Sequence, residues 1–193
     1  MFPMSEVLHE NKTFEKVDYS NKELRDREFS HCVFKSCNFE KADLSGNDFM
    51  DCTFENCNLS LAKMAKTGLK NINFIGCKLT GVDFSPCNDF LFSVNFTSCL
   101  LDYSAFQRKK MKKTKFKDCS IKESHFTDVD LTESGFENCD LLNTFFQQNN
   151  LEKTDFRTAR NFTIDPEQNK MKKAKFSVLG LPGLLGKYDV VIE

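Results

Sequence analysis

An apolar side chain returns at every fifth position along most of this chain. The series runs without a miss from Phe14 to Phe84, and it resumes two residues late, at Leu91, to run on to Phe156. An α-helix is excluded, because residues five apart are rotated by roughly 140° and would scatter around the helix. A flat strand is also excluded, because an odd spacing would send successive members of the series to opposite faces of the sheet.

A chain that bends at every repeat satisfies this pattern. Each five-residue unit then forms one side of a coil, and its central Phe or Leu points to the axis. Four sides close a coil of about twenty residues, and successive coils stack at the parallel-strand spacing of about 4.8 Å. The repeat tract therefore predicts an all-β solenoid of about seven coils, roughly 35 Å long, with its core along the axis.

The residue two positions before each centre is mostly small, as Cys32, Ala42 and Ser124 are, and we expect it to point inward as well. The pattern small, polar, Phe or Leu, polar, polar, seen in the Ala-Asp-Leu-Ser-Gly segment 42–46, resembles the pentapeptide-repeat family. The resemblance covers residues 14–156. It implies a right-handed quadrilateral parallel β-helix, here of about seven to eight coils.

The repeat character does not change along the chain, so we expect one structural domain. Its parts are an N-terminal cap, a first repeat tract, an insertion that breaks the register, a second repeat tract with a distorted last coil, and a C-terminal apolar cap, helical or extended. Their ranges are 1–13, 14–84, 85–90, 91–177 and 178–193. The last coil is expected to be distorted because Asn161 and Pro166 occupy two central positions.

Nine cysteines raise the question of disulfides or a metal, but all except Cys87 occupy the inward small-residue position. A coil of about twenty residues predicts three columns of these cysteines: Cys37 with Cys57 and Cys77, Cys99 with Cys119 and Cys139, and Cys32 with Cys52. We expect buried thiols that pack as small apolar side chains. Stacked Cβ atoms are too far apart for relaxed disulfides, and a line of thiols does not converge on a tetrahedral ion. No metal or cofactor is expected.

The first coils carry a candidate acidic edge. Its carboxylates are Glu23, Asp26, Glu28, Asp43, Asp48 and Asp51. The edge is either an ordinary solvated face or a surface that imitates the phosphates of DNA to a cationic groove. The net charge of only −1 favours the first interpretation.

The segment 107–117 is strongly basic and by itself would suggest nucleic-acid binding. Adding twenty to each number places acidic residues beside these bases, so we expect a mutually neutralising ladder and no direct nucleic-acid contact. The expected neighbours are Arg108 and Asp128, Lys110 and Asp130, Lys113 and Glu133, and Lys117 and Glu137. Lys109 is the exception, because it occupies an inward position and must either snorkel or distort the wall.

No catalytic constellation is apparent. His9, His31 and His125 are far apart in the sequence, no cysteine is paired with a histidine, and a filled rod lacks the concave pocket of an enzyme. We therefore expect a protein without enzymatic activity. The chain shows no apolar run near the ~20 residues of a membrane span and no signal-peptide pattern, which predicts a cytoplasmic protein without membrane contact.

The pentapeptide-repeat resemblance extends to the quinolone-resistance branch of that family. It implies a binding protein that engages a type II topoisomerase, DNA gyrase or topoisomerase IV, as a DNA-mimicking rod and protects it from quinolone-type inhibitors. The alternative is a structural scaffold with a different protein partner. One continuous acidic face would favour mimicry, and mixed charge ladders on all faces would favour the alternative.

Two further surfaces are candidates for contacts with other proteins. The insertion is either a tolerated bulge or a partner loop, with the candidate residues Ser85, Pro86, Cys87, Asn88 and Asp89. The tail either caps the open end of the solenoid or forms a homodimer, as in several gyrase-interacting members of the family. The candidate dimer residues are Leu181, Leu184, Leu185, Tyr188, Val190 and Ile192.

Overall fold

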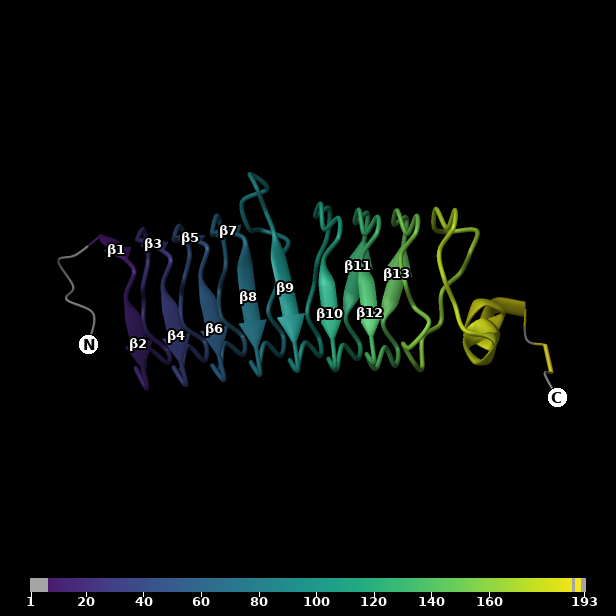
Figure 1. Ribbon diagram of the computed structural model, residues 1–193, viewed down its shortest axis with the longest axis horizontal. Coiled ribbons are helices and arrows are strands. Elements are labelled where there is room, and N and C mark those ends of the chain that lie inside the picture. The colour runs from purple at the N-terminus through teal and green to yellow at the C-terminus, as the bar shows by residue number, and fades with distance from the viewer. Residues whose placement is uncertain (1–6, 189, 192–193) are drawn as a thin grey trace.

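The computed structural model describes residues 7–188 and 190–191 and has the form of a rod of stacked coils (Figure 1). The fold is a parallel β-solenoid of about seven turns with little helix. The five-residue period therefore predicted the fold class correctly.

Two sides of the coils form regular parallel sheets. The first contains β1 (Leu8–Glu10), β3 (Glu28–Ser30), β5 (Asp48–Met50) and β7 (Gly68–Lys70). The second contains β2 (Thr13–Glu15), β4 (Val33–Lys35), β6 (Thr53–Glu55), β8 (Ile72–Ile75), β9 (Val94–Thr97), β10 (Lys115–Lys117) and β12 (Gly135–Glu137). A further parallel pair joins β11 (His125–Thr127) and β13 (Phe145–Gln147).

The remaining sides of the first coils are held by single bridges. Asp18 lies opposite Asn38 on one side, and Glu23 lies opposite Asp43 on the other. Together with the two sheets, these bridges give four sides per coil. Partners in the first tract are twenty residues apart, as Phe34 and Phe54 are in the β4–β6 pair.

The chain turns its corners with left-handed backbone at the second residue after most centres. Examples are Asp26 with a φ of 53°, Lys66 with 58° and Gly46 with 73°. This conformation favours glycine, asparagine and aspartate, and it costs other residues more. The corner N–H groups donate to the next coil, as Asn21 does to the carbonyl of Glu40 at 2.8 Å, and these hydrogen bonds help to hold the strained corners in place.

The central side chains form a stacked aromatic core. The rings of Phe34 and Phe54 stack with centroids 4.6 Å apart, and those of Phe54 and Phe74 with centroids 5.1 Å apart. Rings on adjacent sides meet edge to face, as Phe34 and Phe49 do at 6.0 Å and 76°. Both arrangements are preferred by aromatic quadrupoles. Each ring is thus held by its own column and by the neighbouring one.

The small inward side chains bond to the backbone of the preceding coil. The hydroxyl of Thr67 donates to the carbonyl of Leu44 at 2.9 Å. Most of the thiols point the same way, as that of Cys57 does toward the carbonyl of Phe34, and all nine cysteines are free and buried. The sequence predicted such thiols for all of them except Cys87.

The expected division of the long thiol columns is wrong. The sulfur of Cys77 lies 3.3 Å from the carbonyl of Phe54, and that of Cys99 lies 3.3 Å from the carbonyl of Phe74. The inserted residues bring Cys99 over Cys77, so the six cysteines share one column. A fixed addition of twenty residues missed this because the coil containing the insertion is two residues longer.

The β-ladder continues across the insertion. In the pairing of β8 with β9, Ile72 lies opposite Val94 and Phe74 opposite Phe96, so partners here are 22 residues apart. Figure 1 shows the extra residues as a loop that projects beyond the row of corners next to β8 and β9. The two additional residues therefore leave the rod as a bulge and do not interrupt it.

The last coil is distorted, as the sequence predicts, and its core is filled by residues outside the five-residue series. Phe162 and Ile164 are buried where Asn161 interrupts the period. Phe176 returns to the series and stacks on Phe156 with centroids 5.3 Å apart.

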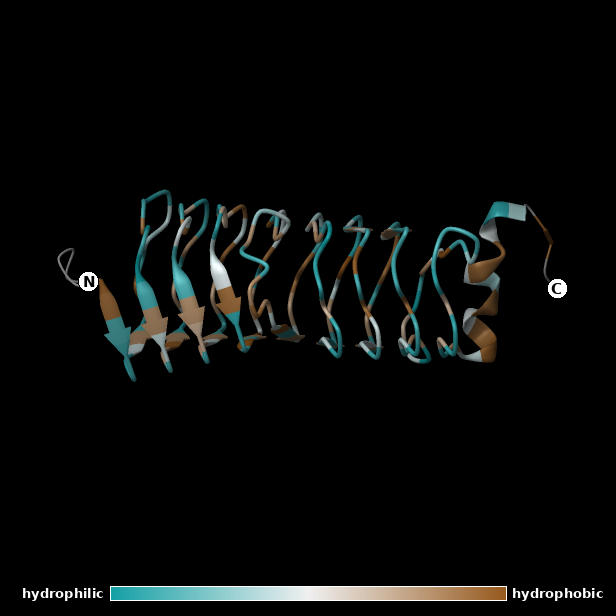
Figure 2. Cartoon of the chain, turned by 90° about the horizontal axis from the view of Figure 1, so that it is seen from above, coloured by the Kyte–Doolittle hydropathy of each residue, from teal (hydrophilic) through white to brown (hydrophobic). Residues whose placement is uncertain are grey.

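Two short 3-10 helices follow the last coil, η1 (Val178–Leu184) and η2 (Gly186–Tyr188), and lie across the end of the rod (Figures 1 and 2). At the other end β1 already pairs with β3, so the ladder begins before Phe14. His9 is buried there and stacks on Phe29 with ring centroids 4.8 Å apart. An imidazole thus takes a central position in the first coil.

We expect Phe54→Ala to lower the free energy of unfolding by about 3–5 kcal/mol, because its ring is 1% exposed and stacked on both sides. Chemical denaturation followed by circular dichroism measures the loss. The matched control is Phe90→Ala, because Phe90 is 66% exposed, and this change should cost less than about 0.5 kcal/mol. A loss below about 1 kcal/mol at Phe54 would contradict the stacked core.

Candidate partner-binding surfaces

The six carboxylates of the acidic edge lie on neighbouring coils at the N-terminal end of the rod. Glu28 lies opposite Asp48 in the β3–β5 pair, and Glu23 lies opposite Asp43. Asp26 and Asp51 occupy corners with left-handed backbone. Two pairs of these carboxylates thus face each other across adjacent coils, and the other two lie at corners of the same coils.

Basic side chains neutralise part of this edge. Arg25 forms an ion pair with Asp43 and lies 3.5 Å from Glu23, and Lys70 lies 2.5 Å from Asp48. The guanidinium of Arg25 lowers the pKa of Asp43 to about 2. Arg25 and Lys70 lie in the same coil as their acidic partners or in the adjacent one. The sequence analysis did not predict these ion pairs.

Three other carboxylates of the edge face the solvent. Asp26, Glu28 and Asp51 are exposed, and within the described residues they form no ion pair with a lysine or arginine. Asp51 lies 4.0 Å from His31 and accepts a hydrogen bond from Asn71 at 2.7 Å. The effective acidic surface is therefore narrower than the sequence suggested.

The insertion begins later than its predicted start, because Cys87 still follows the regular register. Its side chain is 5% exposed, and the amide of the next residue, Asn88, donates to the carbonyl of Thr67 at 2.9 Å, as in the other coils. The prediction that Cys87 lies off the inward pattern is therefore wrong. Burial raises the pKa of its thiol to about 12, so this cysteine is an unreactive packing group and does not suit a partner loop.

The apolar end of the insertion differs from the sequence prediction. Leu91, assigned to a central position, is 65% exposed with a φ of 56°, and Phe92 turns inward in its place. Phe90 is 66% exposed, so Phe90 and Leu91 form an apolar loop tip. The sequence analysis did not predict this exposed apolar tip.

Lys109 anchors the insertion from inside the rod. Its side chain is 2% exposed, and its ammonium donates to the carbonyl of Cys87 and to Oδ1 of Asp89, both at 2.6 Å. The ring of Phe92 covers it, with 5.4 Å from Nζ to the ring centroid. The lysine therefore neither snorkels nor distorts the wall, because the loop supplies an acceptor, a counter-charge and an aromatic cover.

The predicted charge ladder is present in part. Lys113 lies 3.8 Å from Glu133 and Lys117 lies 3.2 Å from Glu137, as expected. Lys110 does lie opposite Asp130 along the backbone, but Lys112 makes the ion pair with this carboxylate, at 3.3 Å. Lys153 adds a second cation to Glu133 at 2.6 Å, so charges of opposite sign alternate from coil to coil.

The tail folds back on its own last coil. Ile164 donates to the carbonyl of Gly183 at 2.9 Å, and the ammonium of Lys187 lies 2.9 Å from Asp165 and 2.6 Å from Glu167. Leu184 packs against the core. The predicted capping of the solenoid is thus accomplished by the protein's own chain.

Much of the apolar surface of this cap still faces outward, and η1 is largely apolar (Figure 2). Leu181, Leu185, Tyr188 and Val190 are exposed. Ile192, another of the predicted dimer residues, lies outside the described residues. The side of the tail that carries these residues is therefore not covered by the last coil.

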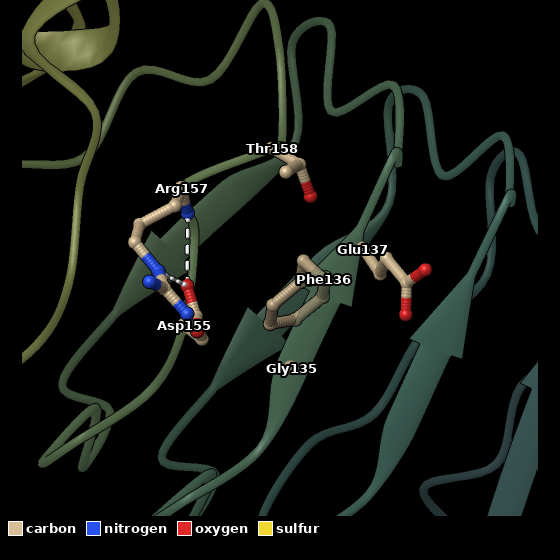
Figure 3. Close-up of a pocket in the computed structure, with 6 residues that line it drawn as sticks. All are labelled: Gly135, Phe136, Glu137, Asp155, Arg157 and Thr158. Atoms are coloured by element: carbon tan, nitrogen blue, oxygen red, sulfur yellow. Dashed lines mark hydrogen bonds and ion pairs between the residues drawn. The ribbon is translucent and has the colours of Figure 1, made fainter.

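The surface also has shallow hollows between coils. One lies over Gly135, where the missing side chain leaves room between Glu137 and Asp155 (Figure 3). The basic residue that lines this hollow, Arg157, already forms an ion pair, since its Nη2 lies 2.7 Å from Oδ2 of Asp155. In the part of the chain that the structure describes, no group of three His, Cys, Asp or Glu side chains is placed to hold a metal ion.

The length of the helices decides whether any of them could cross a membrane. No helix among residues 7–188 and 190–191 has the length and apolar composition needed to cross a bilayer.

Comparisons with known proteins agree with this architecture. A family model described as a pentapeptide repeat region matches residues 47–126. A second model, the SV2A/B/C luminal domain, matches residues 1–84 and 91–164, on either side of the insertion. A search of curated proteins finds no match.

Several solved structures match this chain. Trypsin-treated QnrB1, described as a plasmid-mediated fluoroquinolone resistance protein, is 21% identical, with a TM-score of 0.52 over 96% of this chain and 91% of that one. HetL, a pentapeptide repeat protein involved in heterocyst differentiation regulation in the cyanobacterium Nostoc, is 15% identical, with a TM-score of 0.46 over 91% of each chain. A pentapeptide repeat protein from the Arabidopsis thaliana thylakoid lumen is 26% identical, with a TM-score of 0.34 over 62% of this chain and 68% of that one.

The fold is a parallel β-solenoid with a filled core. The chain belongs to the family of the SV2A/B/C luminal domain, whose model matches most of its length, and its residues 47–126 form a pentapeptide repeat region. QnrB1 has a similar fold.

We expect Lys109→Ala to lower the free energy of unfolding by about 2–4 kcal/mol, because the change leaves a cavity and a buried carbonyl without its donor. It should also speed amide hydrogen exchange in residues 88–92, which the lysine holds. Denaturation and exchange mass spectrometry measure the two effects. The neighbouring exposed Lys110→Ala is the control, and equal effects of both changes would contradict the anchoring role.

Proposed function

We propose that this chain is a non-enzymatic binding protein whose partner is a type II topoisomerase, DNA gyrase or topoisomerase IV. The observation that carries the proposal is the group of exposed carboxylates, Asp26, Glu28 and Asp51, held on the first coils of a rigid rod. Negative groups at a fixed axial repeat would enter a cationic DNA-binding groove in place of phosphates. The fold shared with QnrB1, described as a fluoroquinolone resistance protein, suggests quinolone protection as the activity to test first.

Within this proposal, the exposed carboxylates Asp26, Glu28 and Asp51 make the main contacts with the cationic groove. The apolar tip Phe90–Leu91 adds a contact from the insertion, because it projects from a rigid wall and is held from behind by Lys109. The protein would then act in the cytoplasm, where its nine free thiols stay reduced.

A second candidate function is a scaffold for a protein other than a topoisomerase. The ion pairs favour it, because Arg25, Lys70 and Lys113 pair with carboxylates on different sides and coils of the rod. Such mixed ladders reduce the single-sign field that DNA mimicry requires. The experiment that follows separates the two candidates.

We expect the native protein to restore gyrase supercoiling in the presence of a fluoroquinolone, and the triple variant Asp26→Lys/Glu28→Lys/Asp51→Lys to lose at least ten-fold in potency. Lysine fits both corners, since Lys16 and Lys66 occupy equivalent left-handed positions. A titrated supercoiling assay makes the comparison.

The matched control reverses three exposed acidic residues of the second tract, Asp118→Lys/Glu123→Lys/Asp128→Lys, and should retain protection. Protection lost equally by both variants would point to net charge and not to the acidic edge. Absence of any protection by the native protein up to tens of micromolar would discard the topoisomerase partner and leave the scaffold.

We also propose that the outward side of the tail forms a homodimer. Light scattering should give twice the chain mass of 22.3 kDa for the native protein. The double change Leu181→Asp/Leu185→Asp should give the monomer mass with unchanged circular dichroism, because both side chains are exposed while Leu184 maintains the cap. A native protein that scatters as a monomer at tens of micromolar would refute the dimer.

A further inference from the structure

Six thiols form one continuous column along the inside of the rod, and the proposed function makes no use of them. They are Cys37, Cys57, Cys77, Cys99, Cys119 and Cys139, all free and buried. Neighbours in the column are in contact, since the amide nitrogen of Cys37 lies 3.3 Å from the sulfur of Cys57, and that of Cys57 lies 3.4 Å from the sulfur of Cys77. Cys32 and Cys52 form a separate, shorter stack.

The sulfur atoms of the column share one orientation. The sulfurs of Cys57 and Cys77 each lie 3.3 Å from the carbonyl twenty-three residues earlier, and that of Cys139 lies 3.4 Å from its equivalent. Cys37 and Cys99 make the equivalent contact. Because these side chains point the same way in their own coils, successive sulfurs are separated by roughly the coil spacing of 4.8 Å.

This spacing fits an ion that takes two ligands in a line. Two metal–sulfur bonds of about 2.3 Å, the zinc–thiolate length, span about 4.6 Å end to end. Soft sulfur ligands select Cu(I), and Cu(I) and Ag(I) both accept linear two-coordination. We propose that neighbouring thiols of these columns bind monovalent soft metal ions, Cu(I) or Ag(I), each between two sulfurs of successive coils.

Charge balance sets the protonation of each site. A buried charge without compensation is costly, so one thiol loses its proton to solvent and its neighbour keeps its own. The cation, one thiolate and one thiol then sum to zero, and each ion bound releases one proton. No oxidation or reduction takes place in this step.

The stoichiometry follows from pairing the thiols. The long column holds three ions, one more lies between Cys32 and Cys52, and Cys87 holds none because Thr67 and Lys109 are its neighbours in the column. The native protein, titrated anaerobically with Cu(I) against a colorimetric chelator, should bind about four ions and release about four protons. X-ray absorption should show two sulfur neighbours per copper and no nitrogen or oxygen ligand.

Two variants with equal numbers of cysteines test the role of stacking. The alternating variant, Cys52→Ser/Cys57→Ser/Cys99→Ser/Cys139→Ser, leaves five thiols with no two stacked. The matched control, Cys37→Ser/Cys52→Ser/Cys87→Ser/Cys139→Ser, also leaves five, four of them in one unbroken column. Serine suits this inward position, because Ser124 and Ser134 occupy equivalent ones and donate to the backbone.

The control should bind about two ions, and the alternating variant should bind Cu(I) at least 100-fold more weakly. Thermal melts by circular dichroism establish that both variants are folded. Equal affinities in the two variants, a coordination of three sulfurs or mixed ligands in the native protein, or binding only after denaturation would each overturn the proposal. If the alternating variant does not fold, the ligand count and proton release of the native protein decide.

Discussion

The stacking of each coil directly on the one before it is the constraint on which this structure depends. Every side chain meets the residue at its own position one coil away, at the spacing of parallel strands, about 4.8 Å. A position is therefore stable when its occupants suit one another. Phenylalanine stacks on phenylalanine, the thiols form a column, and surface charges alternate in sign, as Lys113, Glu133 and Lys153 do.

The insertion shows how this constraint is satisfied when the period fails. Two extra residues move out of the wall, so that β9 stacks on β8 and the columns continue. A lysine in the inward position of the next coil, Lys109, then ties the loop to the rod through Cys87 and Asp89. The loop and the lysine depend on each other, because a buried ammonium needs acceptors and the loop backbone needs a donor.

Because the core is filled from end to end, groups that could bind a partner or a ligand lie on the surface or in the columns of stacked side chains. In the proposals made here, the acidic edge and the tip Phe90–Leu91 contact a partner protein, and the thiol column supplies sulfur ligands. On the surface and in the column alike, the coil spacing sets the distance between equivalent side chains. The partial neutralisation of Asp43 and Asp48 by Arg25 and Lys70 limits the acidic edge to Asp26, Glu28 and Asp51.

The sequence by itself determined the fold class, the inward positions and the place of the disturbance near residue 85, because a period of five is incompatible with helix and flat strand alike. Only the tertiary structure decided that Phe92 and not Leu91 turns inward, that Cys87 keeps register, and that Cys99 stacks on Cys77. These outcomes depend on where two extra residues leave the wall, which is settled by packing and hydrogen bonds between coils. The basic side chains that pair with Asp43 and Asp48 likewise depend on how far a side chain reaches across coils. The spacing of residues along the sequence does not give this reach.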